Sequence, residues 1–126
     1  MTAHDNRRSL GRWGEERAAR QLTARGYAIL ARNWRCEAGE LDLVAQDGDT
    51  LVFVEVRTRR GQTLGAPEES VTAGKQARLI ALAESYLQAH PWTGDWRIDV
   101  IAIETDRRGR LLRIDHYEDA VTASPS

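Results

Sequence analysis

Four charged side chains that could act together on a phosphate or a metal ion fall within one twenty-residue segment, 39–58. Two apolar runs in this segment flank an acid-glycine sequence at residues 47–50, a pattern typical of a β-hairpin. Because side chains alternate along strands, one face should carry the four charges, namely Glu40, Asp42, Glu55 and Arg57. Leu41, Leu43 and Ala45 are expected on the opposite face of their strand.

The turn decides which of these residues face each other across the hairpin. A two-residue loop of Gly48 and Asp49, or a four-residue loop, places Asp42 opposite Glu55 and Glu40 opposite Arg57. A loop of Asp47 and Gly48 shifts the partners by two residues and leaves the faces unchanged. Either register predicts a cluster of three acids and one arginine.

Glu55 lies in a run that is apolar on both faces, which predicts an inner strand and a partly buried carboxylate. Such a carboxylate must be paired, protonated or bound to a metal. One interpretation is a structural ion-pair network made by Arg57 and neighbouring arginines. The local excess of negative charge favours the other interpretation, in which a bound metal ion supplies the missing cation.

A helix is predicted from about Arg8 to Arg25 and should end at Gly26. Its small residues Gly11, Gly14 and Ala18 form one stripe that would allow close approach to a sheet, with Glu15 at the edge of that stripe. Glu16 has arginines at i−4 and i+4 and is explained as a surface ion pair. We therefore expect Glu15, rather than Glu16, to lie near the acidic cluster, although a position at the exposed rim explains it equally well.

The remaining pattern predicts a strand at 27–34, a loop at 59–70, a helix at about 72–90, and strands at 96–104 and 111–117. The resulting αβββαββ order implies an α/β fold with a mixed sheet, a helix on each side and an extra C-terminal edge strand. The helix between the third and fourth strands permits a parallel crossover. We expect one domain over 1–126, with flexible ends at 1–6 and 119–126.

Composition restricts the class of protein. The single cysteine, Cys36, excludes a disulfide framework and a cysteine-based zinc cluster. With no apolar run long enough for a membrane span or a signal peptide, we expect a soluble cytoplasmic protein without a membrane partner. Lys75 is the only lysine among 18 basic residues, so the arginine bias is global and does not by itself mark a phosphate-binding surface.

An acid near the end of one strand followed by Glu-x-Lys on the next is the signature of the PD-(D/E)xK nuclease superfamily. The matching residues here are Asp42 and Glu55-Val56-Arg57. More closely, GRWGEERAA, the pair Arg32-Asn33, GELDLV, LVFVEVRTR and RIDVIAI resemble the bacterial YraN family over about residues 11–117. That family is regarded as a distant relative of archaeal Holliday-junction resolvases.

The resemblance implies a restriction-endonuclease-like fold with an αβββαβ core and a Mg²⁺- or Mn²⁺-dependent endonuclease acting on branched nucleic acid, most naturally DNA. Asp42, Glu55 and the Val56 carbonyl would then hold the metal, and Glu15 would help from the helix. Related resolvases act as dimers, which makes a homodimer the corresponding expectation. Arg59 and Arg60 would contact the nucleic acid.

Arg57 departs from the superfamily pattern because it stands where the family has lysine. Arginine keeps the positive charge and can grip a phosphate with two donors, but it stays protonated and cannot act as a base. Glu40 and Lys75 are accessory candidates: Glu40 could fix the Arg57 guanidinium, and Lys75 could supply an ammonium group. Both catalysis and its loss remain open on this sequence.

Two other classes of function compete with the nuclease. The same fold could bind structured nucleic acid through its phosphates without cutting it. Alternatively, the chain could be a structural or partner-binding protein that uses its tryptophans, although such residues more often belong to a core or its rim: Trp13, Trp34, Trp92 and Trp96.

Overall fold

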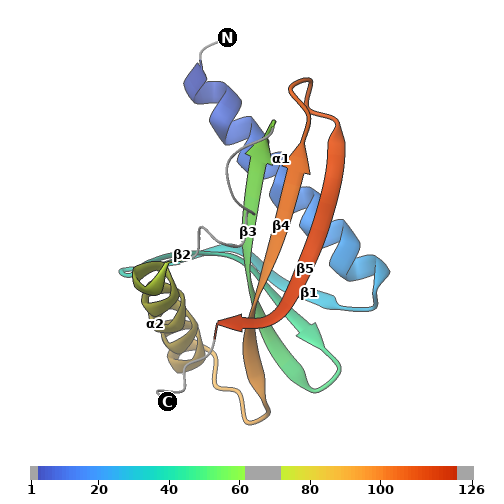
Figure 1. Ribbon diagram of the computed structural model, residues 1–126. Coiled ribbons are helices and arrows are strands. Elements are labelled where there is room, and N and C mark those ends of the chain that lie inside the picture. The colour runs from blue at the N-terminus through green and yellow to red at the C-terminus, as the bar shows by residue number, and fades with distance from the viewer. Residues whose placement is uncertain (1–2, 62–71, 122–126) are drawn as a thin grey trace.

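A computed structural model describes residues 3–61 and 72–121 (Figure 1). Two helices and five strands follow the predicted order. They are α1 (Ala3–Ala24), β1 (Ala28–Cys36), β2 (Gly39–Asp47), β3 (Thr50–Arg60), α2 (Ala73–Ala89), β4 (Trp96–Thr105) and β5 (Leu111–Val121).

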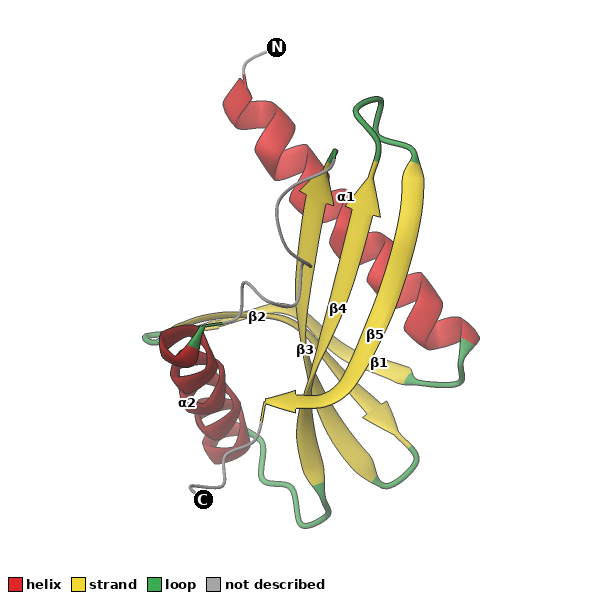
Figure 2. Ribbon diagram, in the orientation of Figure 1, coloured by secondary structure: helices red, strands yellow, loops and turns green. Residues whose placement is uncertain are grey.

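The five strands form one sheet in the order β1-β2-β3-β4-β5. Neighbouring strands run antiparallel except for β3 and β4, which are parallel and are connected through α2. This arrangement confirms the predicted mixed sheet, its parallel crossover and its C-terminal edge strand. The sheet is strongly twisted, and the two helices cover opposite faces of it (Figure 2).

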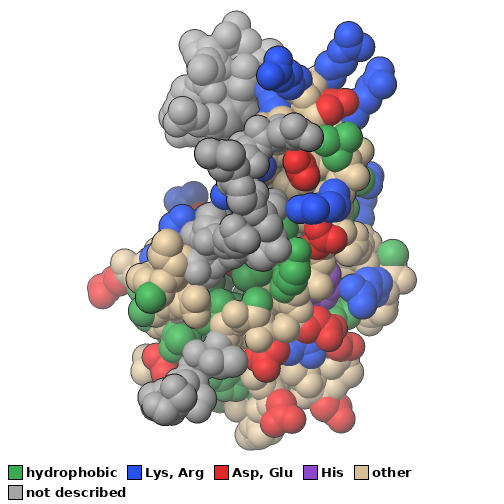
Figure 3. Space-filling model, in the orientation of Figure 1, with side chains coloured by type: hydrophobic (Ala, Val, Ile, Leu, Met, Phe, Trp, Pro, Cys, Tyr) green, Lys and Arg blue, Asp and Glu red, His purple; other side chains and the backbone are tan. Residues whose placement is uncertain are grey.

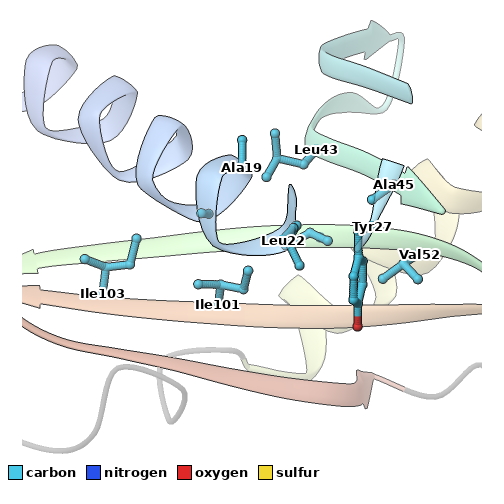
Figure 4. Packing of buried hydrophobic residues seen from close by; sticks show 10 residues of the cluster. Ala19, Leu22, Tyr27, Leu43, Ala45, Val52, Ile101 and Ile103 are labelled. Carbon is cyan, nitrogen blue, oxygen red and sulfur yellow. The ribbon is translucent and has the colours of Figure 1, made fainter. Parts of the chain in front are cut away.

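Each face of the sheet has its own apolar core. Under α1, a cluster that includes Leu22 and Tyr27 packs on Val52, Val54 and Ile101 (Figure 4). Under α2, the alternate residues of β3, Leu51 and Phe53, pack against Leu79, Leu82 and Tyr86. The central strand β3 is therefore covered on both sides, as its two apolar faces predict.

Close contact between α1 and the sheet depends on Gly14. A Cβ atom added there would overlap the side chain of Thr58 on β3, whereas one added at Gly11 would have no neighbour within 4 Å. Ala18 is fully buried one turn further on. The predicted small-residue stripe thus has two different uses, because Gly14 and Ala18 allow contact and Gly11 leaves open space.

The strict alternation predicted for β2 is wrong at one position. Leu43 and Ala45 pack under α1 as expected, but Leu41 joins the α2 cluster with Val44. The backbone pairing of β2 with β3 ends at Leu43 and Val54. Beyond that point β2 no longer follows the pleat of β3, so its side chains change direction relative to the sheet.

Element boundaries differ from the predictions mainly at the ends. α1 begins at Ala3, five residues before the predicted start, since no helix-breaking residue precedes Arg8. β5 continues to Val121, whose buried side chain packs in the α2 cluster. β3 extends to Arg60, which shortens the predicted loop at 59–70, and residues 62–70 of that loop lie outside the described residues.

The tryptophans belong to the cores and their rims. Trp13 packs partly buried against the α1 cluster, and Trp34, Trp92 and Trp96 pack against the α2 cluster. Neither of the described helices is long and apolar enough to span a bilayer.

Candidate metal centre

The candidate site lies where β2 separates from β3. The observed pair Asp47 and Thr50 fixes the register that directs Asp42 toward Glu55. Asp42 Oδ2 accepts the backbone N–H of Val56 at 2.8 Å, just past the last backbone pair. A carboxylate thus takes the place of a backbone acceptor, which keeps the Val56 N–H satisfied and holds Asp42 against the central strand.

Asp42 and Glu55 form a coupled acid pair. Glu55 is 7% exposed. Burial, followed by the charge of Glu55, raises the pKa of Asp42 to about 8, and a hydrogen bond with Glu55 and the charge of Glu15 act in the same direction. The Val56 N–H opposes this shift without cancelling it. Near neutral pH and without a cation, Asp42 therefore holds a proton shared toward Glu55.

Two further acids converge on Asp42. Carboxylate oxygens of Glu15 from α1, Glu40 from β2 and Asp42 lie within 4.8 Å of one another. Asn33 joins Glu15 and Glu40, because its Nδ2 donates to Oε1 of Glu15 at 3.0 Å and to Oε1 of Glu40 at 2.9 Å. Arg35 Nε donates to the other oxygen of Glu40 at 2.8 Å. The hydrogen-bonding partners seen for Glu40 are Asn33 and Arg35, so its role in fixing Arg57 stays a prediction.

Asn33 is a site residue that our sequence analysis did not assign. Its backbone has φ of +52°, a left-handed conformation inside a strand that asparagine adopts more readily than most residues. The signal available in the sequence was an asparagine within an otherwise apolar and basic strand, where asparagine has low propensity. The conformation aims the amide at two carboxylates that would otherwise repel each other.

Arg57 lies beside the acids. Its Nη1 is 3.3 Å from Glu55 Oε2, and its side chain is 21% exposed. Together with Glu15, Val56 and Thr58 it lines a hollow of about 370 Å³. A second hollow of about 350 Å³ is lined by Glu15, Glu40 and Asn33, among others. Glu15 and Gly11 border both hollows, so solvent and a ligand can reach Glu15 from two sides.

The other predicted site residues lie further along β3 and at the start of α2. Arg59 lines the first hollow, and Arg60 is exposed at the end of β3. Lys75 lies in the first turn of α2, where Thr72 caps the helix by accepting the Lys75 backbone N–H. α2 covers the face of the sheet opposite α1, and a contact between the Lys75 ammonium group and the acids stays a prediction.

The donor set suits a hard divalent cation. Mg²⁺ prefers oxygen ligands about 2.1 Å away, so ligand atoms of one ion lie at most about 4 Å apart. The three carboxylate oxygens lie within 4.8 Å of one another, so a small inward movement would let them share an ion. A cation would also compensate the acid charge that Arg57 alone does not balance. The converging atoms belong to Glu15, Glu40 and Asp42, with Glu55 hydrogen-bonded behind Asp42, which differs from the predicted set of Asp42, Glu55 and the Val56 carbonyl.

A second buried acid, Asp99 on β4, has a contrasting environment. It is fully buried, and its oxygens accept hydrogen bonds from Arg97 Nε at 3.0 Å, His116 Nε2 at 2.8 Å and the Asp119 N–H at 2.9 Å. Burial alone would raise the pKa of Asp99, but these donors outweigh it and lower the pKa. Asp99 is thus held by donors that favour its charged form, whereas Asp42 lies among other acids even though Arg35 and Arg57 form ion pairs in that cluster.

His116 has a defined tautomer in this second centre. Arg25 Nη1 lies 3.0 Å from His116 Nδ1 and can only donate, so Nδ1 is the acceptor and Nε2 carries the hydrogen that is donated to Asp99. Arg97 also donates to the Tyr27 hydroxyl at 2.9 Å. Sequence analysis noted Arg97 and Asp99 only within the RIDVIAI motif, because the partners lie far apart in the chain.

Comparison with known proteins agrees with the sequence resemblance. A family model described as "Uncharacterised protein family UPF0102" matches residues 14–103. A UPF0102 protein of Roseiflexus castenholzii is 54% identical over 91% of this chain and 94% of its own length. Relatives from Pelotomaculum thermopropionicum (53%; 92% of this chain and 98% of the relative) and Chloroflexus aurantiacus (55%; 91% and 94%) bear the same family name. The chain therefore belongs to the UPF0102 family, also known as the YraN family.

Proposed function

We propose that this protein is a metal-dependent endonuclease that hydrolyses phosphodiester bonds in structured nucleic acid, with DNA as the expected substrate. The observation that carries the proposal is the clustering of Glu15, Glu40 and Glu55 around Asp42. The pKa of Asp42 is raised even though Arg35 pairs with Glu40 and Arg57 pairs with the buried Glu55. Networks that serve stability alone pair their charges, as Asp99 does. An acid with a raised pKa next to open hollows, which Glu15 and Glu40 line, favours chemistry.

The cation implied by this donor set is Mg²⁺ or Mn²⁺, held by Asp42, Glu15 and Glu40. Glu55 would hold Asp42 in place and contribute charge. When bound, the ion would lower the pKa of a coordinated water and offset charge on the phosphate. In the hydrolysis, water oxygen adds to phosphorus, the bond from phosphorus to one sugar oxygen breaks, and that oxygen takes up a proton as it leaves.

The side chains around the ion have separate tasks. Asn33 fixes the orientation of Glu15 and Glu40 through the two hydrogen bonds of its amide. Arg57 faces the hollow and would bind the phosphate, where its permanent charge stabilises the transition state. Because a guanidinium does not deprotonate, the proton of the attacking water must pass to a carboxylate, and Glu15 is the acid that borders both hollows.

The test is cleavage of linear, nicked and four-way-junction DNA in Mg²⁺ by Asp42→Asn and Glu55→Gln. Loss of outer-shell partners of a metal commonly costs 10–100-fold, so removing these acids should reduce the rate by about 100-fold or more. Asp49→Asn, at the exposed hairpin turn, is the matched control and should retain the wild-type rate. Cleavage that survives in both site variants would remove the proposal.

The identity of Arg57 favours a second candidate, a nucleic-acid-binding protein of the same fold without catalysis. Arg57→Lys separates the two, since it restores the residue type found at this position in the resembling nucleases while keeping the charge. In an active enzyme, Arg57→Lys should retain or raise the Mg²⁺-dependent rate. Metal-independent binding with no cleavage by the wild type or by Arg57→Lys would favour the binding protein.

A further inference from the structure

The exposed arginines differ in whether an acid neutralises them. Several form ion pairs with described acids: Arg20, Arg32, Arg35 and Arg113. Among the exposed arginines for which no ion pair is seen within residues 9–61 and 72–121, four lie together at the end of β3 and in the β4–β5 turn. We call them the turn-arginine face, and they are Arg60, Arg107, Arg108 and Arg110.

The four side chains come from two parts of the chain that the sheet brings together. The Gly61 N–H donates to the Thr105 carbonyl at 2.7 Å, which ties the end of β3 to the end of β4. Arg60 and Arg107 line one open hollow of about 710 Å³ together with Asp106 and Leu112. In Figure 1 the β4–β5 turn extends past the end of β3, and Figure 3 shows basic side chains gathered around this tip.

Nearby acids offset only part of this positive charge. Asp106 Oδ1 accepts the backbone N–H groups of Arg108 and Arg110, each at 2.8 Å, so its carboxylate closes the turn. Glu104 and Asp115, the acids on the adjoining strands, are both paired with Arg113. The turn backbone is therefore held in place while its arginine side chains extend into solvent, which is a preorganised arrangement for binding anions.

We propose that the turn-arginine face binds the phosphates of a duplex arm of the nucleic acid, an inference whose substrate rests on the proposed function. Arg60 follows Arg57 by three residues on β3, so its Cα atom lies about 10 Å further along the strand and its side chain lies on the other face of β3. Nucleotides advance by about 3.4 Å along a duplex axis, which corresponds to about three nucleotides. The described residues lining the hollow include no aromatic side chain for stacking, which favours a duplex over a single strand.

The experiment measures binding in EDTA, where cleavage cannot interfere, by fluorescence anisotropy with a 20-base-pair duplex across a salt series. Each lost phosphate contact lowers the slope of log affinity against log salt by about 0.9. Arg107→Ala/Arg108→Ala/Arg110→Ala should therefore reduce the slope by about 2 to 3 and weaken binding at least tenfold at low salt. Circular dichroism of the variant should match the wild type, because all three side chains are exposed.

Two single variants control for the loss of one positive charge. Arg108→Ala should reduce the slope by about 0.9, whereas Arg20→Ala removes the same charge and should leave the slope unchanged. Arg20 is 69% exposed, and its partner Glu16 keeps Arg32 at 2.7 Å, so no acid is left unpaired. An unchanged slope in the triple variant would overturn the inference.

Two arms separate this inference from its alternatives. Vesicles containing phosphatidylglycerol test a membrane surface, and turn-dependent binding to them without binding to the duplex would also overturn the inference. Cleavage of the substrates in Mg²⁺, measured for the wild type beside the binding of the triple variant, tests the link to the proposed function. If the wild type cuts no substrate in Mg²⁺ while the triple variant still loses duplex affinity, the proposed catalysis fails and the phosphate-binding face stands.

Discussion

Asp42 and Asp99 are strand carboxylates of the same sheet with opposite surroundings. Asp99 receives hydrogen bonds from an arginine, a histidine and a backbone N–H, and its pKa is lowered. Asp42 receives one backbone N–H and lies among Glu55, Glu15 and Glu40, and its pKa is raised. Burial penalises both carboxylates, so the partners and not the burial decide which of them is ionised.

This difference in partners distinguishes the structural centre at Asp99 from the candidate site at Asp42. At Asp99 the local choices agree, because every strong hydrogen-bonding group that faces the carboxylate favours its charged form. Around Asp42, several carboxylates lie close together, and their mutual repulsion opposes folding. The Asn33 amide donates hydrogen bonds to two of them, Glu15 and Glu40. Conflicts of this kind between local charge and fold stability are expected at functional sites.

The largest predicted effect is on the matched centre. Asp99→Ala leaves the partly buried Arg97 without its closest acid and should lower the free energy of unfolding by about 3–5 kcal/mol. Asp42→Asn replaces a carboxyl group that is already largely protonated at neutral pH by a neutral amide of the same shape, and should change that free energy by less than about 1 kcal/mol. Urea denaturation measures both. Equal destabilisation by the two substitutions would contradict the contrast between the centres.

The pH dependence of stability should have opposite signs at the two centres. The folded pKa of Asp42, about 8, lies above the unfolded value of about 4, so the folded state binds the extra proton between these values. Its contribution is complete below about pH 4 and is lost as pH rises to about 8, by at most about 1.4 kcal/mol per pH unit. Asp99, whose pKa is lowered, contributes stability that is lost as pH falls below about 4.

Asp42→Asn isolates this dependence. Unfolding free energies measured from pH 5 to pH 8 in EDTA should fall less steeply with pH in this variant than in the wild type, because the titrating group is gone. The decrease remaining in Asp42→Asn reports the other groups of the protein. A wild-type slope as shallow as that of the variant would mean that Asp42 is ionised throughout.

A smaller effect on stability is expected where α1 packs against the sheet and carries Glu15 to the site. Gly14→Ala places a methyl group against Thr58 and should cost about 1–3 kcal/mol, while shifting the neighbouring Glu15 away from Asp42. Gly11→Ala is the matched control, since its methyl group has no neighbour within 4 Å and should stabilise the helix by about 0.5–1 kcal/mol. Thermal unfolding and Mg²⁺ affinity are the measurements. Similar losses in both variants would show that close packing at Gly14 is not required.

Much of the fold follows from local patterns. The helix at 72–90 and the hairpin at 39–58 have clear signals, since Thr72 caps the helix and Asp47 with Thr50 closes the turn as the register predicts. Leu41 was placed on the wrong face because alternation holds only while a strand stays paired. The end of pairing between β2 and β3 is a tertiary event that no local pattern records.

The part of the site that depends on local sequence patterns was also predictable. Acids within one hairpin could be grouped by counting residues from the turn, and Glu15 could be placed by helical periodicity. Asn33 acts through a left-handed backbone conformation, and Asp99 through His116 and Asp119, which are remote in sequence. Hydrogen bonds between such residues depend on how strands are paired, which composition and periodicity do not specify.

The smallest predicted effect on stability comes from adding Mg²⁺, which tests the acidic cluster around Asp42 directly. Mg²⁺ bound at the acids requires Asp42 to ionise, and at pH 7 this group is largely protonated, so binding should release about one proton. Calorimetry in two buffers of different ionisation enthalpy measures that proton. If the dissociation constant is about 1 mM, 10 mM Mg²⁺ should stabilise the fold by about 1.4 kcal/mol.

Asp42→Asn is the control for this titration, because it keeps the shape of the side chain and removes the proton that would be released. It should bind Mg²⁺ more weakly and show no dependence on the buffer. Asp99→Asn, if it folds, should release the same proton as the wild type, since its centre is already neutralised by Arg97 and does not contribute to the cluster. Proton release that persists in Asp42→Asn would show that the metal binds to other groups. It would contradict the proposed difference between the Asp42 cluster and the Asp99 centre.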